Sequence, residues 1–234
     1  QAEASVKVKE VAEFSGSVTR IVQPRGVKGS LRWIQHYVNE DPRALQPESL
    51  SKIEWVSPLE SDGFAEYRDA SMLARLGHEN LSADLLDFWP RGGPQWDALG
   101  RLQDGGVVLV EAKAHLAEFA SPGTAAGAVS RQRIETALNN VRDALGVVEA
   151  TSWADHFYQY TNRLAHLWWF TKHDIDAHLL FVSFLGDQAM KGPSCGQDWH
   201  DAYARADTIL GLPRVHELSA RIHHVMPDVC LLGD

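Results

Sequence analysis

An acid, a base and an imidazole occupy alternate positions near the end of one apolar segment, residues 107–115. Because the side chains of a strand alternate between its two faces, Glu111, Lys113 and His115 would share one face. The other face carries only valine and alanine, which predicts that it packs beneath a helix. We therefore expect a buried strand whose charged end lies at a rim of the sheet.

A second acid, Asp97, stands in the preceding segment, just after a turn rich in proline and glycine at residues 90–94. Mg²⁺ and Mn²⁺ prefer oxygen ligands, and two carboxylates can hold either ion. A bound ion lowers the pKa of its water and polarises a phosphoryl oxygen, while a nearby lysine stabilises developing charge. Asp97, Glu111 and Lys113 thus have the chemistry needed for phosphodiester hydrolysis. The alternative interpretation is a solvated Glu–Lys pair and an ordinary turn aspartate.

Pro94-Gln95-Trp96-Asp97, followed after thirteen residues by Glu111-Ala112-Lys113, resembles the motif of the PD-(D/E)XK nuclease superfamily. The resemblance covers residues 94–113, with two residues between the proline and the aspartate. It implies a restriction-endonuclease-like core of helix, strands, helix and strand. It also implies that both acids bind a divalent metal, that the backbone carbonyl of Ala112 is a further metal ligand, and that Lys113 is catalytic.

Members of this superfamily often add an acid from the helix that precedes the motif. Here the candidates are Glu66 and Asp69, with Glu79 behind them. All three fall in a segment with helical periodicity, where a charged residue is more often plain solvated surface. Glu66 is the acid that we expect to complete the site.

A polar stripe on a later aromatic helix is the second signal. Gln159, Asn162, Arg163 and His166 recur at positions that share one helix face. Some branches of the superfamily place a glutamine and a tyrosine on a helix beside the metal site, and Tyr158-Gln159-Tyr160 resembles that pair at a different spacing. Gln159 is therefore a candidate site residue. A stripe that is simply the solvent face of the helix is an equally open interpretation.

The periodicity of apolar residues sets the expected elements. Helices are predicted over 31–39 with Ser30 as the N-cap, 64–87 with a break near Gly77, 125–145, 153–171 and 197–210. Strands are predicted over 17–22, 52–57, 95–102, 107–114, 177–185 and 228–232. This order predicts an α/β fold of the mixed (α+β) kind, with a central mixed sheet flanked by helices. We expect residues 1–60 to form an N-terminal extension packed on a nuclease-like core over 61–234.

The turn between the two motif strands must obey a parity rule. Opposed residues of an antiparallel pair point to the same face, so a slip of one residue would separate Asp97 from Glu111. A two-residue Asp104-Gly105 turn gives the wrong parity. A three-residue loop, either Gln103-Asp104-Gly105 or Asp104-Gly105-Gly106, gives the right one, and each ends on a glycine. The sequence therefore predicts an odd loop or a compensating bulge.

Charge limits how nucleic acid could bind. The chain has 234 residues and a formal net charge of −9, so a general positive field is excluded. A local basic cluster is expected to contact phosphate, with a solvated surface run as the other interpretation. Its members are Arg20, Arg25, Lys28 and Arg32.

Two cysteines, and neither a signal peptide nor an apolar run of membrane length, indicate a reducing, cytoplasmic setting without a membrane partner. The sequence leaves an oligomer possible.

Two functions from different classes fit these residues. The first is an Mg²⁺- or Mn²⁺-dependent nuclease acting on DNA, with RNA as the less favoured substrate. The second is a catalytically inactive protein that keeps the nuclease fold as a nucleic-acid- or protein-binding module. Geometry separates them, because a working site requires both carboxylates to converge on an open cleft.

Overall fold

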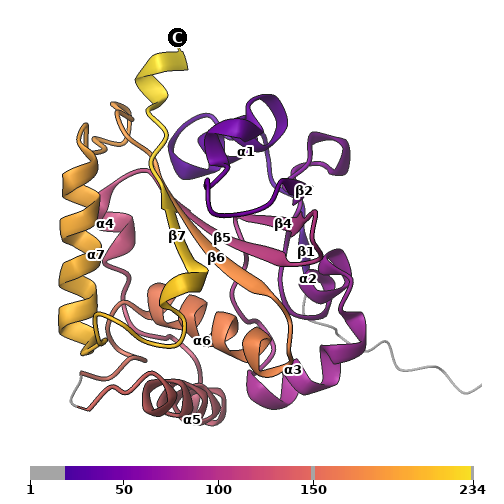
Figure 1. Cartoon of the computed structure of the whole chain (residues 1–234), viewed down its shortest axis with the longest axis vertical. Helices are drawn as coiled ribbons and strands as arrows, with labels where there is room; N and C mark the ends of the chain where they lie inside the picture. The colour runs from indigo at the N-terminus through magenta and orange to yellow at the C-terminus, as the bar shows by residue number, and fades with distance from the viewer. Residues whose placement is uncertain (1–18, 149–150, 233–234) are drawn as a thin grey trace, which may run out of the picture.

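The computed structural model describes residues 19–148 and 151–232. A mixed sheet of five strands crosses its centre in the order β2-β4-β5-β6-β7 (Figure 1). Its strands are β2 (Ile53–Ser57), β4 (Ala98–Leu102), β5 (Val107–Lys113), β6 (Ala177–Ser183) and β7 (Ile222–Val225). β2, β4 and β5 pair antiparallel, whereas β5, β6 and β7 run parallel. A separate short pair joins β1 (Arg20–Ile21) to β3 (Glu66–Tyr67).

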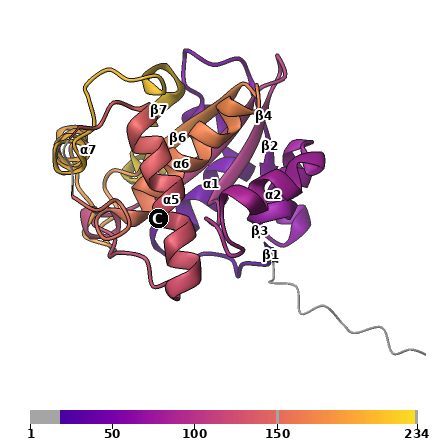
Figure 2. The same cartoon turned by 90° about the horizontal axis from the view of Figure 1, so that it is seen from below.

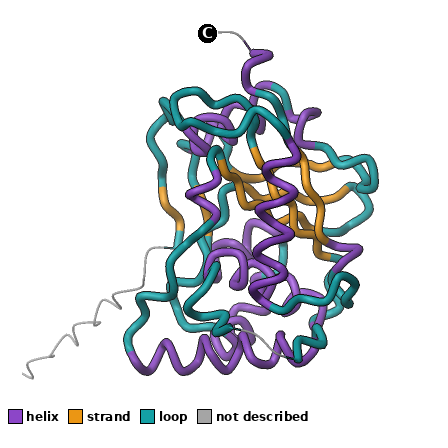
Figure 3. Tube along the Cα trace, turned by 90° about the vertical axis from the view of Figure 1, so that its left-hand side faces the viewer, coloured by secondary structure: helices purple, strands orange, loops and turns teal. Residues whose placement is uncertain are grey.

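Helices cover both faces of the sheet, as an α/β fold requires (Figure 3). One face packs against α1 (Gly29–Glu40) through a cluster that includes Val108, Val110 and Ala112 of β5. This is the valine and alanine face that the sequence predicts to lie beneath a helix, and the prediction is confirmed.

The opposite face carries the larger core. Its helices are α2 (Asp69–Leu76), α3 (Ser82–Phe88), α5 (Ala128–Ala144), α6 (Tyr158–Lys172) and α7 (Gly196–Leu210). The short α4 (Leu116–Phe119) follows β5 directly. α2 gathers with β1 and β3 at one end of the molecule, and α7 lies at the other (Figure 2). β5 is buried on both faces, so its charged end is more enclosed than we expect of a position at the rim of the sheet.

The β4–β5 hairpin has the predicted odd loop. Ala98 pairs with Val110 and Arg101 with Val107, and the Leu102 N–H donates to the Gly106 carbonyl at 2.7 Å. The loop is thus Gln103-Asp104-Gly105, and the same register sets Asp97 opposite Glu111. Parity therefore places both acids on the face that α6 covers.

Two expected elements are wrong. Residues 64–87 are not one broken helix, because Glu66 lies in strand β3 and the chain turns at Asp69, whose φ is 50°. The break near Gly77 is confirmed, since this residue ends α2 at a φ of 88°. The final strand is β7 at Ile222–Val225 rather than 228–232, which is largely a 3₁₀ turn. Pro227, which cannot donate a ladder hydrogen bond, separates the two segments.

Two helix starts also differ from expectation. α6 begins at Tyr158 rather than at 153, because Trp153 is buried in the preceding turn, where its indole N–H donates to the Leu210 carbonyl at 3.0 Å. Lys28, not Ser30, occupies the N-cap of α1. Of the strand expected at 17–22, residues 17 and 18 lie outside the described residues.

Residues before 60 contribute one strand and one helix to these layers. β2 pairs with β4 at the edge of the sheet, and α1 covers the face beside it. Within residues 19–148 and 151–232, no helix combines the length and the apolar character needed to cross a bilayer.

Gly105 provides a test of the hairpin geometry. Its φ of 102° is rarely adopted by residues with a side chain, so Gly105→Val is expected to lower the free energy of unfolding by about 1–2 kcal/mol. The neighbouring substitution Gln103→Val, at an exposed loop position, should change it by less than about 0.5 kcal/mol. Urea unfolding of both variants measures the difference. Equal effects would contradict the loop conformation.

Candidate active site

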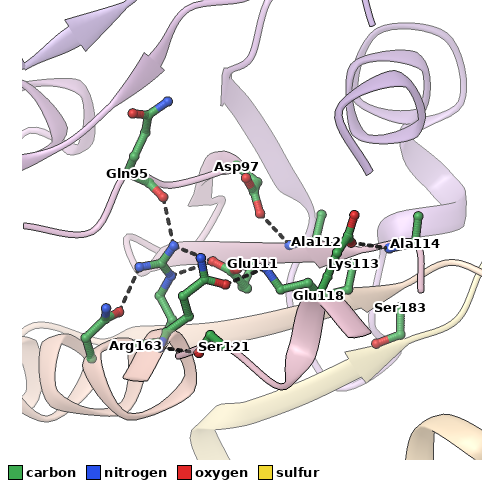
Figure 4. A network of polar contacts seen from close by, with 12 residues as sticks. Gln95, Asp97, Glu111, Ala112, Lys113, Ala114, Glu118, Ser121, Arg163 and Ser183 are labelled. Carbon is green, nitrogen blue, oxygen red and sulfur yellow. Dashed lines mark hydrogen bonds and ion pairs between the residues drawn. The ribbon is translucent and has the colours of Figure 1, made fainter. Parts of the chain in front are cut away.

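One cleft of about 390 Å³ collects the side chains that the sequence singles out. Asp97 enters it just before β4, Glu111 and Lys113 from the end of β5, and Gln159 from the first turn of α6. Glu66 reaches it from β3. Segments far apart in the sequence thus bring all five residues to one place (Figure 4 labels three of them).

The carboxylate of Glu111 is buried between two cations (Figure 4). Its Oε1 accepts a hydrogen bond from Nζ of Lys113, and its Oε2 accepts one from Nε of Arg163 at 2.6 Å. Burial acts to raise the pKa of Glu111, but the charges of Arg163 and Lys113 outweigh it, so the pKa falls below its ordinary value. Glu111 is therefore ionised at neutral pH.

Lys113 is held from two sides. Its ammonium also donates to Oε1 of Gln159 at 2.9 Å. Burial acts to lower the pKa of Lys113, yet the negative charges of Glu111 and Asp97 raise it above the ordinary value. The lysine is therefore a fixed cation and not a neutral base.

Asp97 faces this pair from the residue just before β4. Its Oδ2 accepts the backbone N–H of Ala112 at 2.7 Å, and in the described part of the chain its other oxygen makes no hydrogen bond. Burial, followed by the charge of Glu111, raises the pKa of Asp97 to about 8. Asp97 is thus a carboxylate whose charge needs a further cation nearby.

The backbone of β5 adds an oxygen to the same place. The carbonyl of Val110 accepts the Asp97 N–H at 3.2 Å, and backbone groups of alternate residues leave a strand on the same side. The carbonyl of Ala112 therefore leaves β5 on the side of Asp97.

Glu66 is buried beside this group on the strand β3, not on a helix as expected. Its Oε2 accepts hydrogen bonds from Gln95 and, at 2.8 Å, from Gln23. Burial raises its pKa. Gln23 and Gln95 fix the carboxylate at the cleft, although neither stands out in the sequence.

The other two candidate acids have different places. Asp69 accepts the backbone N–H groups of Gly92 and Gly93 at 2.9 and 3.0 Å, so it supports the turn before β4. Glu79 is exposed in a 3₁₀ turn and does not line the cleft. His115 also points elsewhere, with its Nε2 3.2 Å from a carboxylate oxygen of Glu118.

The polar stripe of α6 faces the protein interior. Gln159 is exposed at the cleft, but Asn162, Arg163 and His166 are buried, so interpreting the stripe as the solvent face is wrong. Arg163 is also the charge partner of Glu111, a role that the sequence did not reveal. It donates to the Gln95 carbonyl at 2.9 Å, and its guanidinium lies 4.7 Å from the Trp96 ring centroid.

The basic cluster expected to contact phosphate is partly neutralised. Arg20 pairs with Asp62 at 2.7 Å, and Arg25 pairs with Glu60. Lys28 and Arg32 form no ion pair with any residue in 19–148 or 151–232. Contact of this cluster with nucleic acid stays a prediction.

No protein-family model, curated protein or solved structure matches this chain. The candidate site is therefore judged on its own geometry. Across the described ranges, no group of three or more His, Cys, Asp or Glu side chains is arranged to hold a metal ion. A cation at the cleft would therefore have to combine carboxylate oxygens with backbone oxygens or water.

A substitution at Arg163 tests whether its positive charge stabilises the buried carboxylate of Glu111. Arg163→Met leaves a buried carboxylate without one of its two partners, and we expect a loss of about 3–5 kcal/mol in the free energy of unfolding. Adding Glu111→Gln should recover part of that loss, which a double-mutant cycle measures. Arg25→Met, which breaks an exposed pair, serves as the control and should change little. Additive effects of the two site substitutions would contradict the pairing.

His166 gives a pH dependence. Burial lowers its pKa to about 3, whereas the unfolded chain titrates near 6.5, so only the unfolded state gains this proton between those values. Its stabilising contribution is complete above pH 6.5 and declines as the pH falls towards 3. Between pH 7 and pH 5, the wild type should lose about 2 kcal/mol more stability than His166→Gln. Identical pH profiles from chemical denaturation would refute this assignment.

Proposed function

We propose that this chain is a metal-dependent nuclease that hydrolyses phosphodiester bonds of DNA, with RNA as the less favoured substrate, in the cytoplasm. The convergence of Asp97, Glu111, Lys113 and Gln159 on one cleft is the observation that carries the proposal. A working site requires both carboxylates to converge on an open cleft, and Glu66 lines this cleft as well.

The donor set fits a hard divalent cation. Asp97, Glu111 and the carbonyl of Ala112 would hold Mg²⁺ or Mn²⁺, ions that accept carboxylate and carbonyl oxygens together with water. When bound, the metal supplies a water of lowered pKa and a positive charge beside the phosphate. The raised pKa of Asp97 supports this fit, because a nearby cation favours the ionised carboxylate.

Lys113 would be the catalytic cation. Its ammonium is fixed between Glu111 and Gln159 at the cleft, so it can donate to an attacking water or to a phosphoryl oxygen without reorganisation. Gln159 holds the lysine through its amide oxygen, and its side-chain N–H groups, which have no hydrogen-bond partner among the described residues, could donate to substrate. The two residues together would orient the nucleophile.

Charge balance at the cleft supports an anionic substrate only after a metal binds. The acids Glu66, Asp97 and Glu111 outnumber the bases Lys113 and Arg163 there. With all acids ionised, the cluster carries one net negative charge, and a divalent cation turns this into one net positive charge. Phosphate binding should therefore depend on the metal.

One observation favours the second candidate, an inactive nuclease-fold module that binds nucleic acid or protein. Both oxygens of Glu111 are already engaged, by Lys113 and Arg163, so this carboxylate has a complete set of partners without a metal. In that function the ion pairs are structural, and no divalent cation would bind at Asp97.

Cleavage assays on single- and double-stranded DNA and RNA, with Mn²⁺ or Mg²⁺, separate the two candidates. Lys113→Ala should lower the cleavage rate on the order of 10²–10³-fold while Mn²⁺ still binds. Asp97→Asn should remove both Mn²⁺ binding and cleavage, because it removes an anionic ligand.

Glu79→Gln, which changes an exposed acid outside the cleft, is the matched control and should behave as wild type. Calorimetry that gives the same Mn²⁺ binding for wild type and Asp97→Asn would exclude the proposed site. Binding of nucleic acid without cleavage under any of these conditions would favour the inactive module.

A further inference from the structure

Two histidines face each other at the end of β6 that is remote from the cleft. β6 runs parallel to β5 with Ala177 beside Val107 and Ser183 beside Lys113, so residues near 177 lie at the opposite sheet edge from the site. Because Leu180 of β6 pairs with His223 of β7, His178 and His223 share one face of the sheet.

The ring nitrogens of this pair lie close together. Nδ1 of His178 is 3.0 Å from Nε2 of His223, and the ring centroids are 5.1 Å apart. Both side chains are partly buried, and neither lines the candidate active site.

The outer nitrogen of each ring has its own partner. Nε2 of His178 lies 3.4 Å from Oδ1 of Asp176, and Nδ1 of His223 lies 3.2 Å from the hydroxyl of Ser49. A carboxylate only accepts, so Nε2 of His178 carries the proton and Nδ1 presents a lone pair. The Ser49 hydroxyl can accept the Nδ1 proton of His223, which leaves a lone pair on its Nε2.

The partners of the two outer nitrogens are of the kind found around metal-bound imidazoles. Such rings donate the outer N–H to a carboxylate or another acceptor, which fixes the tautomer and directs the inner lone pair at the metal. Two nitrogens, each about 2.1 Å from one cation, lie about 3.0–3.4 Å apart for ligand angles of about 90–109°. The separation of the His178 and His223 nitrogens, 3.0 Å, is within this range.

The surrounding charges favour a divalent cation. Burial lowers the pKa of both histidines, in His223 to about 4, so both rings are neutral and able to coordinate at neutral pH. The charged groups that act on His178 are Asp176, Asp104 and Arg221. Arg221 is itself paired with Asp176 at 2.6 Å, which leaves one net negative charge among the three.

We propose that His178 and His223 form a binding site for a divalent cation of the borderline-soft class, with Zn²⁺ as the first choice. Over the described ranges no third side-chain ligand completes a cluster, so water fills the remaining positions. The cation would fasten the edge strand β7 to β6. Through the hydrogen bond of His223 it would also fix Ser49, in the segment that leads into β2.

Zn²⁺ titration by calorimetry tests this site in the whole chain. We expect a binding event in the wild type that weakens by about tenfold or more in His178→Gln and in His223→Gln, since each loses one of two protein ligands. The event should persist in His156→Gln, which removes an exposed imidazole elsewhere, and in Asp97→Asn, which alters the cleft. The Asp97→Asn arm separates this proposal from the nuclease proposal.

Three results would overturn the inference. They are the absence of Zn²⁺ binding to the wild type, equal affinity in wild type and both histidine variants, and loss of the event in Asp97→Asn alone. The first would mean that the two rings share only a direct N–H···N hydrogen bond. Far-UV circular dichroism checks folding, and His223→Gln, on the edge strand, decides the matter if His178→Gln does not fold.

Discussion

The buried charge of Glu111 is the constraint on which the arrangement of the polar core depends. A lone carboxylate at such a position costs several kcal/mol, so the fold must bring cations to it. Lys113 reaches it from the same strand, and Arg163 reaches it from α6. Arg163 also binds the Gln95 carbonyl, which places the loop before β4 and with it Asp97. One ion-pair network thus joins the hairpin, the helix and the loop.

The same network would set the conditions for the proposed catalysis. Lys113 and Arg163 stabilise Glu111 without a metal, and they compete with any metal for its two oxygens. Asp97 is the opposite case, since it has an oxygen free of hydrogen bonds in the described part of the chain and a raised pKa. In the proposed nuclease, a cation would bind first where Asp97 lacks a partner and would then share Glu111 with the bases. The two candidate functions differ in the role of Glu111. In the nuclease it would bind the metal, and in the inactive module it would only form ion pairs.

Parity and periodicity explain how much of this could be predicted. The alternation in residues 107–113 predicts a strand and a helix that covers its valine and alanine face. The need for Asp97 to share a face with Glu111 predicts the odd loop. All three follow from local geometry. Glu66 was expected on a helix, since its short pairing with β1 is a tertiary contact that leaves no period in the sequence. The role of Arg163 was missed for a similar reason. A buried charge looks solvated until its partner 52 residues away is known.

The central claim is that Asp97, Glu111 and the carbonyl of Ala112 surround a divalent cation. Crystals soaked in Mn²⁺ test it most directly, because the anomalous scattering of manganese locates the ion without reference to activity. The account predicts one peak within about 2.0–2.4 Å of oxygens from Asp97 and Glu111, with the Arg163 guanidinium displaced from Oε2 of Glu111. A fully soaked crystal with no peak at the cleft, and with Arg163 still bound to Glu111, would contradict it.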